Sequence, residues 1–287
     1  MFTGWVYDHL IQRGAVVKVA HSAMLKAIAA GKKKNDRLDA RKISDLLRCN
    51  YFPECYMAPC QLRDRRRVLR YRNLLVHQSV RMKNKISGLL METGVPYNKQ
   101  QLHRKRYFQQ LLEEQRELMP DSLPKLLRLS RSTIETLTSL DRQLITQLRG
   151  DPMLVERVNR LMTIPGVGPV LALTWALETG EAKRFRSVKH AVSYCGLCSA
   201  EQSSAGKMQR TPISKQRNKH LQTTLIEAAK VAPRWHPELA RVYEHERQKG
   251  NRNRGTLAVA RKLVAYLLAI DRGEREFVAQ PPHVASV

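Results

Sequence analysis

The sequence predicts a mostly α-helical protein with a short α/β piece at its N-terminal end. Three observations support this prediction: apolar residues recur three and four positions apart within 62–148, a β-branched run lies at 15–20, and Gly150-Asp151-Pro152 marks a boundary. We therefore expect three parts. They are an α/β piece at 1–60, a helical coiled coil at 61–150 and a helical domain at 151–287.

Helix and strand patterns alternate in the first part. A helix is expected from Trp5 to Arg13, ended by Gly14 and followed by the strand Ala15–Ala20. Further helices are expected at 22–30 and from the following basic loop to about Leu47. A single strand needs partners for its backbone groups, so either this domain is truncated or its sheet is completed from elsewhere.

The second part is predicted to contain two long helices joined by a loop, because Met119-Pro120 and Leu123-Pro124 interrupt the helical pattern. A coiled-coil stripe with one polar position follows. It comprises Ile134, Leu137, Asp141, Leu144 and Leu148. No obvious partner for this stripe occurs elsewhere in the chain, so we expect a dimer.

The third part is predicted to be largely helical. Helices are expected at 153–162, 169–178, 187–195, 214–232 and 255–271. Between the first two lies the turn Ile164–Pro169, which contains Gly166 and Gly168 and looks like a helix-hairpin-helix. Exposed N–H groups at such a helix start can hold a phosphate without reading bases. A plain turn between two helices is the alternative.

The charge balance predicts a polyanionic partner. Lys and Arg total 51 against 25 Asp and Glu, which gives a formal net charge of +26. An arginine run lies at 63–72 and includes Arg65, Arg66 and Arg67. It can be interpreted either as a surface that contacts phosphates or as a solvated helix face. The most apolar stretch, 257–270, contains two cations and is too short to span a bilayer, so nucleic acid is favoured over a membrane.

The cysteines and the N-terminus favour a cytoplasmic protein. Five cysteines are an odd number, which argues against a disulfide framework, and no secretory signal pattern is visible. Cys195 and Cys198 have the spacing of a zinc half-site, but no second pair at ligand spacing occurs. We therefore expect them to be small buried residues.

Two short motifs carry candidate chemistry. Asp36 and Asp39, three apart at a helix start, can turn toward one divalent cation, although acids there also suit the positive end of the helix dipole. The turn Ser203-Ser204-Ala205-Gly206 offers an unhindered hydroxyl to act as a nucleophile, although such a sequence is also typical of a loop. Together the motifs suggest a metal-plus-serine enzyme.

The order of several motifs resembles one family. The two acids are followed by the turn at 164–169 and then by Tyr194-Cys195-Gly196-Leu197. Ser203–Lys207 and Ile213-Ser214-Lys215 complete the order. The chain is similar to the DEDD transposases of insertion sequences related to the Piv DNA invertase. The resemblance covers essentially the whole chain, and the combination is more specific than any of its pieces.

The resemblance implies an N-terminal RuvC-like nuclease domain whose four acids hold Mg²⁺, then a coiled coil, then a domain with a nucleophilic serine. It maps the third and fourth acids onto Asp36 and Asp39. It maps the nucleophile onto Ser204, with the adjacent Ser203 as an alternative. Attack on a DNA phosphate would give a covalent phosphoserine intermediate.

Partners follow from the same resemblance. Lys207 and Arg210 are expected to offset the negative charge that develops near the serine. The substrate is expected to be DNA, selected by a guide RNA that the element encodes. Recombination of two duplexes requires at least a dimer.

The N-terminal end departs from the family pattern. The family's first acid lies on a strand that would precede this chain, and its second precedes a Thr-Gly pair that resembles Thr3-Gly4. The chain therefore resembles an N-terminally truncated member with weak or absent Mg²⁺ binding and impaired activity. The leading hypothesis is an insertion-sequence transposase or DNA recombinase; the alternative is a non-catalytic nucleic-acid-binding remnant.

Overall fold

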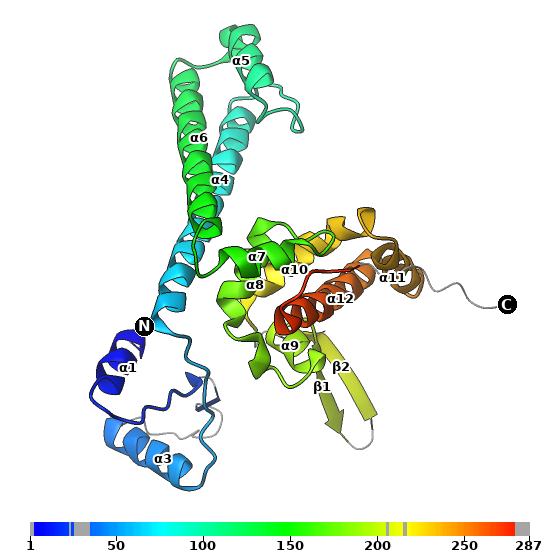
Figure 1. Cartoon of the computed structure of the whole chain (residues 1–287). Helices are drawn as coiled ribbons and strands as arrows, with labels where there is room; N and C mark the ends of the chain where they lie inside the picture. The colour runs from blue at the N-terminus through cyan, green and yellow to red at the C-terminus, as the bar shows by residue number, and fades with distance from the viewer. Residues whose placement is uncertain (1–2, 23, 26–34, 205–206, 215–216, 279–287) are drawn as a thin grey trace, which may run out of the picture. The chain divides into compact units, whose positions relative to one another are not determined.

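The computed structural model describes residues 3–22, 24–25, 35–204, 207–214 and 217–278, with only the backbone described at 200–212 (Figure 1). The mostly helical fold class is confirmed. The chain divides into two compact units, residues 1–64 and residues 65–287, and each is described by itself. The predicted division near residue 150 falls inside the second unit, and the three-part organisation remains a prediction.

The helices and strands, in chain order, are α1 (Thr3–Ile11), α3 (Asp36–Arg48), α4 (Cys60–Glu92), α5 (Lys105–Glu114), η1 (Arg116–Leu118), α6 (Ser122–Arg149), α7 (Val155–Met162), α8 (Pro169–Thr179), η2 (Ala182–Arg184), α9 (Val188–Tyr194), β1 (Ser199–Ser204), β2 (Lys207–Ile213), α10 (Lys219–Val231), η3 (Ala232–Arg234), α11 (Pro237–Gln248) and α12 (Arg252–Gly273). Among the described residues, no helix combines the length and apolar character that crossing a bilayer requires.

The first unit contains α1, α3 and the first residues of α4. Helix α1 ends at Ile11, and Gly14 follows with φ of +76°, a left-handed conformation that glycine adopts without strain. The predicted first helix and its glycine stop are therefore confirmed. Helix α3 begins after Asn35, whose side chain accepts a 2.9 Å hydrogen bond from the N–H of Arg37.

The strand predicted at 15–20 is not found as a strand in the described part of the chain. Its backbone forms one isolated antiparallel bridge, between Ala20 and Glu54, and the Val16 side chain is 93% exposed. The RuvC-like α/β piece is therefore not confirmed. A β-branched run has strand propensity, but a strand forms only where a partner pairs with its backbone. The helix predicted at 22–30 falls mostly outside the described residues.

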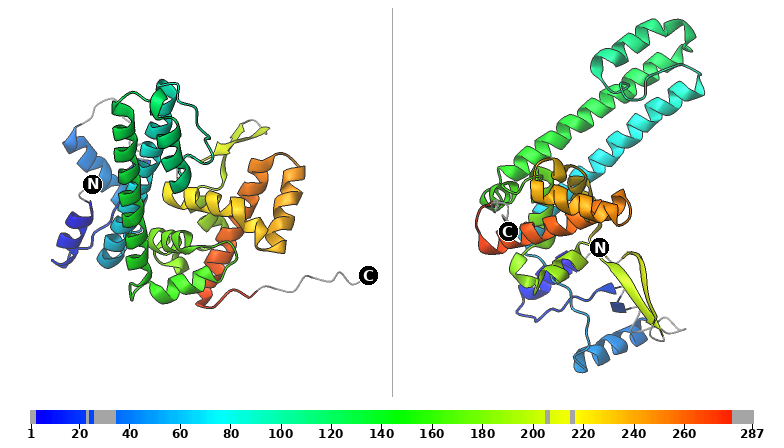
Figure 2. Two further views of the ribbon diagram at one scale, coloured as in Figure 1. Left: turned by 90° about the horizontal axis from the view of Figure 1, so that it is seen from above. Right: turned by 90° about the vertical axis from the view of Figure 1, so that its right-hand side faces the viewer.

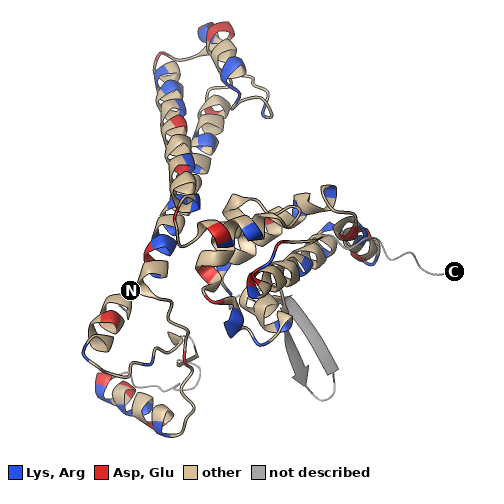
Figure 3. Ribbon diagram, in the orientation of Figure 1, with Lys and Arg blue, Asp and Glu red and all other residues tan. Residues whose placement is uncertain are grey.

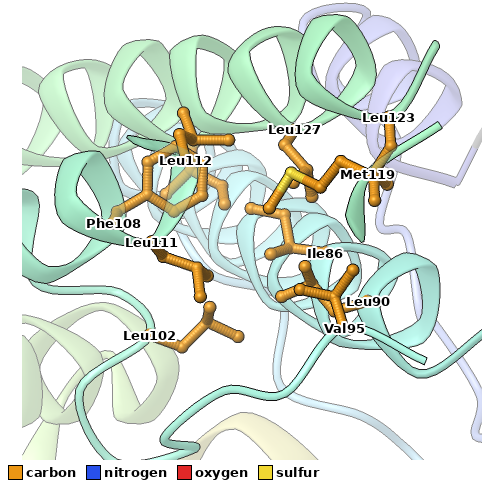
Figure 4. Packing of buried hydrophobic residues seen from close by; sticks show 11 residues of the cluster. Ile86, Leu90, Val95, Leu102, Phe108, Leu111, Leu112, Met119, Leu123 and Leu127 are labelled. Atoms are coloured by element: carbon orange, nitrogen blue, oxygen red, sulfur yellow. The ribbon is translucent and has the colours of Figure 1, made fainter. Parts of the chain in front are cut away.

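In the second unit, α4 and α6 run side by side as a long helical hairpin, with α5 at its far end (Figures 1 and 2). Figure 4 shows the apolar cluster that holds this end together, in which Ile86 and Leu90 of α4 pack with Leu127 of α6 and Phe108 of α5. All of these side chains are at most 4% exposed. Helical spacing on α4 and α6 places the apolar residues on the facing sides of the two helices.

The coiled-coil stripe of α6 thus has its partner in the same chain. Ile134 belongs to the apolar cluster, and the polar position, Asp141, accepts a hydrogen bond from Arg72 of α4. The premise that this stripe has no partner in the chain is therefore wrong, and the dimer remains a prediction. The sequence pattern shows that the apolar stripe must pack against another helix but does not show which helix that is.

The helical hairpin turns at a different place from the one predicted. Helix α4 ends at Glu92, and Gly94 follows with φ of +70°. Pro124 lies in the first turn of α6, where a missing N–H is tolerated because it would have no partner within the helix. Three helices occupy this region instead of the two predicted.

The remaining helices of the second unit pack around α8 and α12. Every residue of α8 from Leu171 to Thr179 is buried. The indole Nε1 of Trp175 donates a 2.8 Å hydrogen bond to Asp271 of α12, and Arg157 of α7 donates to both oxygens of the same carboxylate at 2.7 Å. One buried acid therefore joins α7, α8 and α12.

Most predicted helices of this region are confirmed, with two differences. Helix α11 was not predicted, and the helix predicted from residue 214 begins at Lys219. The antiparallel hairpin of β1 and β2 occupies 199–213, where the sequence predicts only a polar turn. Its residues are mostly polar and give no apolar alternation.

Candidate functional site

The two predicted metal ligands lie in the first turn of α3, in the first unit. Asp36 is exposed and Asp39 is half-buried. Their carboxylates are the oxygen ligands that Mg²⁺ prefers, and two of them leave most octahedral positions to water or a phosphate. The two carboxylates can therefore supply some of the ligands of a Mg²⁺ site. Within the described residues there is no group of three or more His, Cys, Asp or Glu side chains that could hold a metal.

The predicted nucleophile lies in the second unit, at the end of β1. The register pairs Ser204 with Lys207, so these two residues flank 205–206, which lie outside the described residues. Ser203 precedes Ser204 on β1, and Arg210 lies three positions beyond Lys207 on β2. The backbone thus places both serines and Lys207 at one end of the hairpin.

Hydrogen bonds from two helices hold the chain just before β1. The carbonyl oxygen of Leu197 accepts a 2.8 Å bond from Nε of Arg261 on α12. The carbonyl oxygen of Gly196 accepts a 2.6 Å bond from Nε2 of Gln222 on α10. Leu197 is fully buried, so the base of the hairpin is part of the core. Sequence reasoning missed both contacts, because each joins residues far apart in the chain.

A buried carboxylate holds the chain just after β2. Glu178, at the end of α8, accepts two 2.8 Å hydrogen bonds from Arg70 of α4 and one of 2.8 Å from Nδ2 of Asn218. Asn218 also caps α10, since its Oδ1 accepts hydrogen bonds from the N–H groups of His220 and Leu221 at 3.1 and 3.2 Å. Glu178 therefore ties the start of α10 to α4 and α8.

The ionisation of Glu178 follows from these contacts. Burial raises its pKa, but the hydrogen bonds from Arg70 and Asn218 and the charge of Arg66 prevail and lower it below the ordinary value. The group is therefore an anion at neutral pH. Sequence reasoning missed it, although a lone acid ending an otherwise apolar helix is a visible signal.

The cysteine pair before the hairpin is not arranged for chemistry. Burial raises the pKa of the Cys195 thiol to about 12, so the thiol stays protonated at neutral pH. Cys195 is buried, as predicted, whereas Cys198 is half-buried. All five cysteines lie in the described part of the chain and are free.

The glycine turn between α7 and α8 has two different glycines. Gly166 has φ of +83°, and a Cβ built there would lie 2.5 Å from Cβ of Ala232. Gly168 directly precedes α8, has no side-chain cap, and a Cβ there would meet nothing within 4 Å. Gly166 is thus required by the turn, whereas Gly168 presents backbone to an open space. The phosphate-binding role of this turn remains a prediction.

The arginines of α4 take part in the fold. Nε of Arg65 donates a 2.6 Å hydrogen bond to Asp151, and Nε of Arg66 donates one of 2.7 Å to the carbonyl oxygen of Leu177. Arg67 is exposed. Phosphate contact by this set stays a prediction, and the structure gives Arg65 and Arg66 intramolecular partners as well.

Comparison with protein families matches both ends of the chain. Residues 3–95 match the DEDD_Tnp_IS110 family, described as a transposase, and residues 158–244 match the family described as Transposase IS116/IS110/IS902. The first match contains Asp36 and Asp39, and the second contains Ser203 and Ser204.

Curated relatives carry compatible names. The chain is 26% identical over 209 residues to a probable family 20 transposase of Pseudomonas aeruginosa, covering 70% of this chain and 61% of that protein. It is 27% identical over 229 residues to the transposase for insertion sequence element IS1328 of Yersinia enterocolitica, covering 78% and 66%. It is 29% identical over 146 residues to the pilin gene-inverting protein of Moraxella bovis, covering 50% and 45%.

The matched segments thus span between 45% and 66% of the length of these three relatives. The two domain matches nevertheless occur in the order that the motifs predict, with the acid pair in the first and the serine pair in the second. Residues 3–95 and 158–244 are thus transposase domains of the IS110/IS116/IS902 type.

Proposed function

We propose that this chain acts on DNA as an insertion-sequence transposase, with Ser204 as the nucleophile for strand cleavage and rejoining. The observation that carries the proposal is the position of Ser203-Ser204 at the end of β1, within the family-matched segment 158–244. The base of that hairpin is held by Arg261 and Gln222. An anchored hairpin supports the proposal because a nucleophile must be presented in a fixed position.

The chemistry is a pair of transesterifications. The Ser204 hydroxyl loses its proton as Oγ attacks a DNA phosphorus, the bond from phosphorus to one deoxyribose oxygen breaks, and that oxygen leaves as a hydroxyl. A deoxyribose hydroxyl of another strand end then attacks the phosphoserine and releases Ser204 with its proton restored. The phosphoester bond is conserved throughout, so rejoining needs no external energy source.

Asp36 and Asp39 are proposed to hold Mg²⁺. When bound, the ion would supply stabilisation of the negative charge that develops at the scissile phosphate. Lys207 and Arg210, on the strand paired with β1, are proposed to contribute positive charge on the serine side. A serine hydroxyl is a poor nucleophile at neutral pH, so these cations support the assignment of the reaction to this hairpin.

The proposed partners follow from charge and family. The net charge of +26 supports DNA binding, with the turn at Gly166 and Gly168 and the α4 run Arg65, Arg66 and Arg67 as proposed contacts. Figure 3 shows Lys and Arg spread over the helices of the second unit and not confined to one end. A guide RNA and a dimer or higher homo-oligomer are proposed from family resemblance.

One observation favours a second candidate, a nucleic-acid-binding protein without catalysis. No cluster of three or more potential metal ligands occurs among the described residues, so Asp36 and Asp39 are the only acids assigned to Mg²⁺. Two carboxylates bind this ion weakly. The two candidates differ in one result: only the transposase forms a covalent bond to DNA.

The test is to incubate the full chain with Mg²⁺ and an internally labelled duplex that carries the DNA flanking its own coding sequence, so that the label is retained whichever deoxyribose oxygen leaves. Parallel reactions contain RNA transcribed from that flanking DNA. The proposal predicts a protein–DNA adduct that survives denaturing electrophoresis and disappears when EDTA removes the metal. Binding without an adduct in every reaction would support the non-catalytic candidate.

Matched variants separate metal binding from helix stability. Asp36→Asn and Asp39→Asn should each abolish the adduct while leaving DNA binding intact. Asp45→Asn is the control, because Asp45 lies on the same helix and pairs at the surface with Arg48. Loss of the adduct in all three variants would assign the effect to α3 in general and would contradict a metal role for the first two.

A further inference from the structure

A cleft of about 900 Å³ lies within the second unit, between α4, the start of α8 and α10. Residues 70–77 of α4 form one wall, Gly166 to Leu171 another, and 217–231 the third. The open side of Gly168 faces this space. The cleft is therefore bounded by the glycine turn on one side and by the start of α10, next to the hairpin base, on the other.

The charged groups of the cleft are mostly cationic. Arg70 and Arg72 are offset by their pairs with Glu178 and Asp141. Arg217 and Lys219 are exposed, and neither forms a salt bridge with another described residue. Glu227 is the one acid among the described residues that line the cleft, and it is paired with Lys230 at 2.6 Å. Two cations that form no ion pair with another described residue thus line the cleft, together with His77 and His220.

The position of Arg217 is fixed by its surroundings. Gly196 has φ of +70°, and a Cβ built there would lie 2.3 Å from Cβ of Arg217, so the Arg217 stem packs directly over Gly196. Nη1 of Arg217 donates a 3.2 Å hydrogen bond to the carbonyl oxygen of Ser214. The guanidinium group is therefore held at the mouth of the cleft.

The residues that line the cleft favour one kind of nucleic acid over another. Among the described residues that line it there is no Phe, Tyr or Trp. Proteins that bind single strands commonly stack unpaired bases on such rings. Small residues, threonines and cations instead suit the sugar–phosphate backbone of a duplex, whose bases stay stacked.

From these observations we propose that the cleft binds the phosphate backbone of double-stranded DNA through Arg217 and Lys219, opposite the backbone of Gly168. The inference rests on the proposed function for its choice of DNA as the duplex. It adds a binding surface on α4 and α10 to the glycine turn. It also places that DNA next to the hairpin that carries Ser204, because Gly196 and Ser214 flank the two strands.

The test measures binding of the full chain to a labelled duplex of about 30 base pairs over a range of salt concentrations. Arg217→Gln/Lys219→Gln keeps a polar side chain with an apolar stem at both positions and removes two charges. We expect affinity to fall about tenfold at 0.1 M salt and the slope of log affinity against log salt to decrease by about 2.

The matched control is Lys125→Gln/Arg128→Gln on α6. These two residues are exposed, form no ion pair with another described residue and lie outside the cleft. The control removes the same net charge as the cleft variant. Because salt screens exposed charges that lie away from the bound DNA, the control should leave the affinity within about twofold. An equal loss in both variants would show that only the overall charge matters, and this would overturn the proposal.

A second pair of variants provides an independent test of the cleft in case the Arg217→Gln/Lys219→Gln variant does not fold. Thr223→Glu places a negative charge in the cleft, and Thr136→Glu places one on α6. The two positions are matched, because both threonines are exposed and both hydroxyls donate a hydrogen bond to the carbonyl oxygen four residues earlier. We expect only Thr223→Glu to weaken duplex binding. Normal binding by Thr223→Glu would contradict the proposal.

Two further probes test the ligand class. Single-stranded DNA and duplex RNA of the same length should lose less affinity than duplex DNA in the Arg217→Gln/Lys219→Gln variant. An equal or larger loss for either probe would overturn the assignment to duplex DNA. Binding is measured in a Ser204→Ala background, so it does not depend on cleavage. An adduct without cleft binding would refute this inference alone, and cleft binding without an adduct would refute the proposed chemistry alone.

Discussion

The guanidinium group of Arg70 donates two hydrogen bonds of 2.8 Å to the carboxylate of Glu178, whose side chain is only 1% exposed. This bidentate pair joins α4 to the end of α8, residues more than one hundred positions apart in the chain. The same carboxylate holds Asn218, which caps α10. The segment that follows the hairpin with the predicted nucleophile is thus tied through Asn218 and Glu178 to α4.

Removing one partner of this pair should destabilise the second unit. Arg70→Ala leaves the buried Glu178 charge with fewer donors. Since the Arg70 side chain is 48% exposed, we expect a loss of about 2 kcal/mol in the free energy of unfolding. Arg254→Ala, which breaks an exposed pair with Glu246, is the control and should have a much smaller effect. Urea unfolding of the two variants provides the measurement. Equal losses in the free energy of unfolding would show that the pair with the buried Glu178 carboxylate stabilises the protein no more than the exposed pair does.

The pH dependence of stability should report the same pair. The lowered pKa of Glu178 means that its contribution is fully present above its ordinary value of 4.5 and is lost as the pH falls through the lowered folded-state value. Glu178→Gln removes this dependence. We therefore expect its melting temperature to fall less steeply than that of the wild type below about pH 4.5. Parallel acid curves for the two proteins would contradict the assignment.

The two glycines of the α7–α8 turn should respond differently to alanine. Gly166→Ala combines a left-handed backbone with a contact of 2.5 Å to Ala232, so we expect a loss of about 2 kcal/mol or more. Gly168→Ala meets open space and should leave the thermal midpoint nearly unchanged. If Gly168→Ala unfolds as readily as Gly166→Ala, the two glycines do not differ in backbone conformation and surroundings as described.

Duplex binding should tighten as the pH falls, through His220. Burial lowers the pKa of this imidazole, Glu178 opposes that effect, and Arg70, Lys219 and His77 add to it. A phosphate in the cleft would favour the charged imidazole, so binding should take up a proton and strengthen between about pH 7.5 and 5.5.

Comparing the wild type with His220→Gln measures this linkage. The variant should bind with a weaker pH dependence, whereas His190→Gln, an exposed histidine outside the cleft, should behave like the wild type. An unchanged pH dependence in His220→Gln would exclude His220 as the linked group.

The sequence predicts the helices well where local pattern decides them. The periodic apolar residues of α6 and the Pro169 start of α8 are visible without a structure, since helix spacing and capping are local properties. The strand at 15–20 was mispredicted because strand formation depends on a partner elsewhere. The β1–β2 hairpin was missed because its polar residues show no alternation.

The candidate site was predictable only in its motifs. Asp36 and Ser204 can be singled out by residue type and spacing, and family resemblance assigns their roles. The density of the arginine run could not reveal its acidic partners, because Asp141, Asp151 and Glu178 all lie far along the chain. Local charge shows that cations are present but does not show what neutralises them.

Peptide mapping of the trapped adduct identifies the residue that forms the covalent bond to DNA, which we propose to be Ser204. The adduct formed by the full chain on its flanking DNA is digested with protease and nuclease, and mass spectrometry locates the modified residue. We predict a nucleotide joined through its phosphate to Oγ of Ser204, an adduct that persists in Ser203→Ala, and no adduct in Ser204→Ala despite unchanged DNA binding. Two results would contradict the assignment to Ser204. One is a modification on Ser203 or on any other residue, and the other is the lack of an adduct from wild-type chain that binds the same DNA.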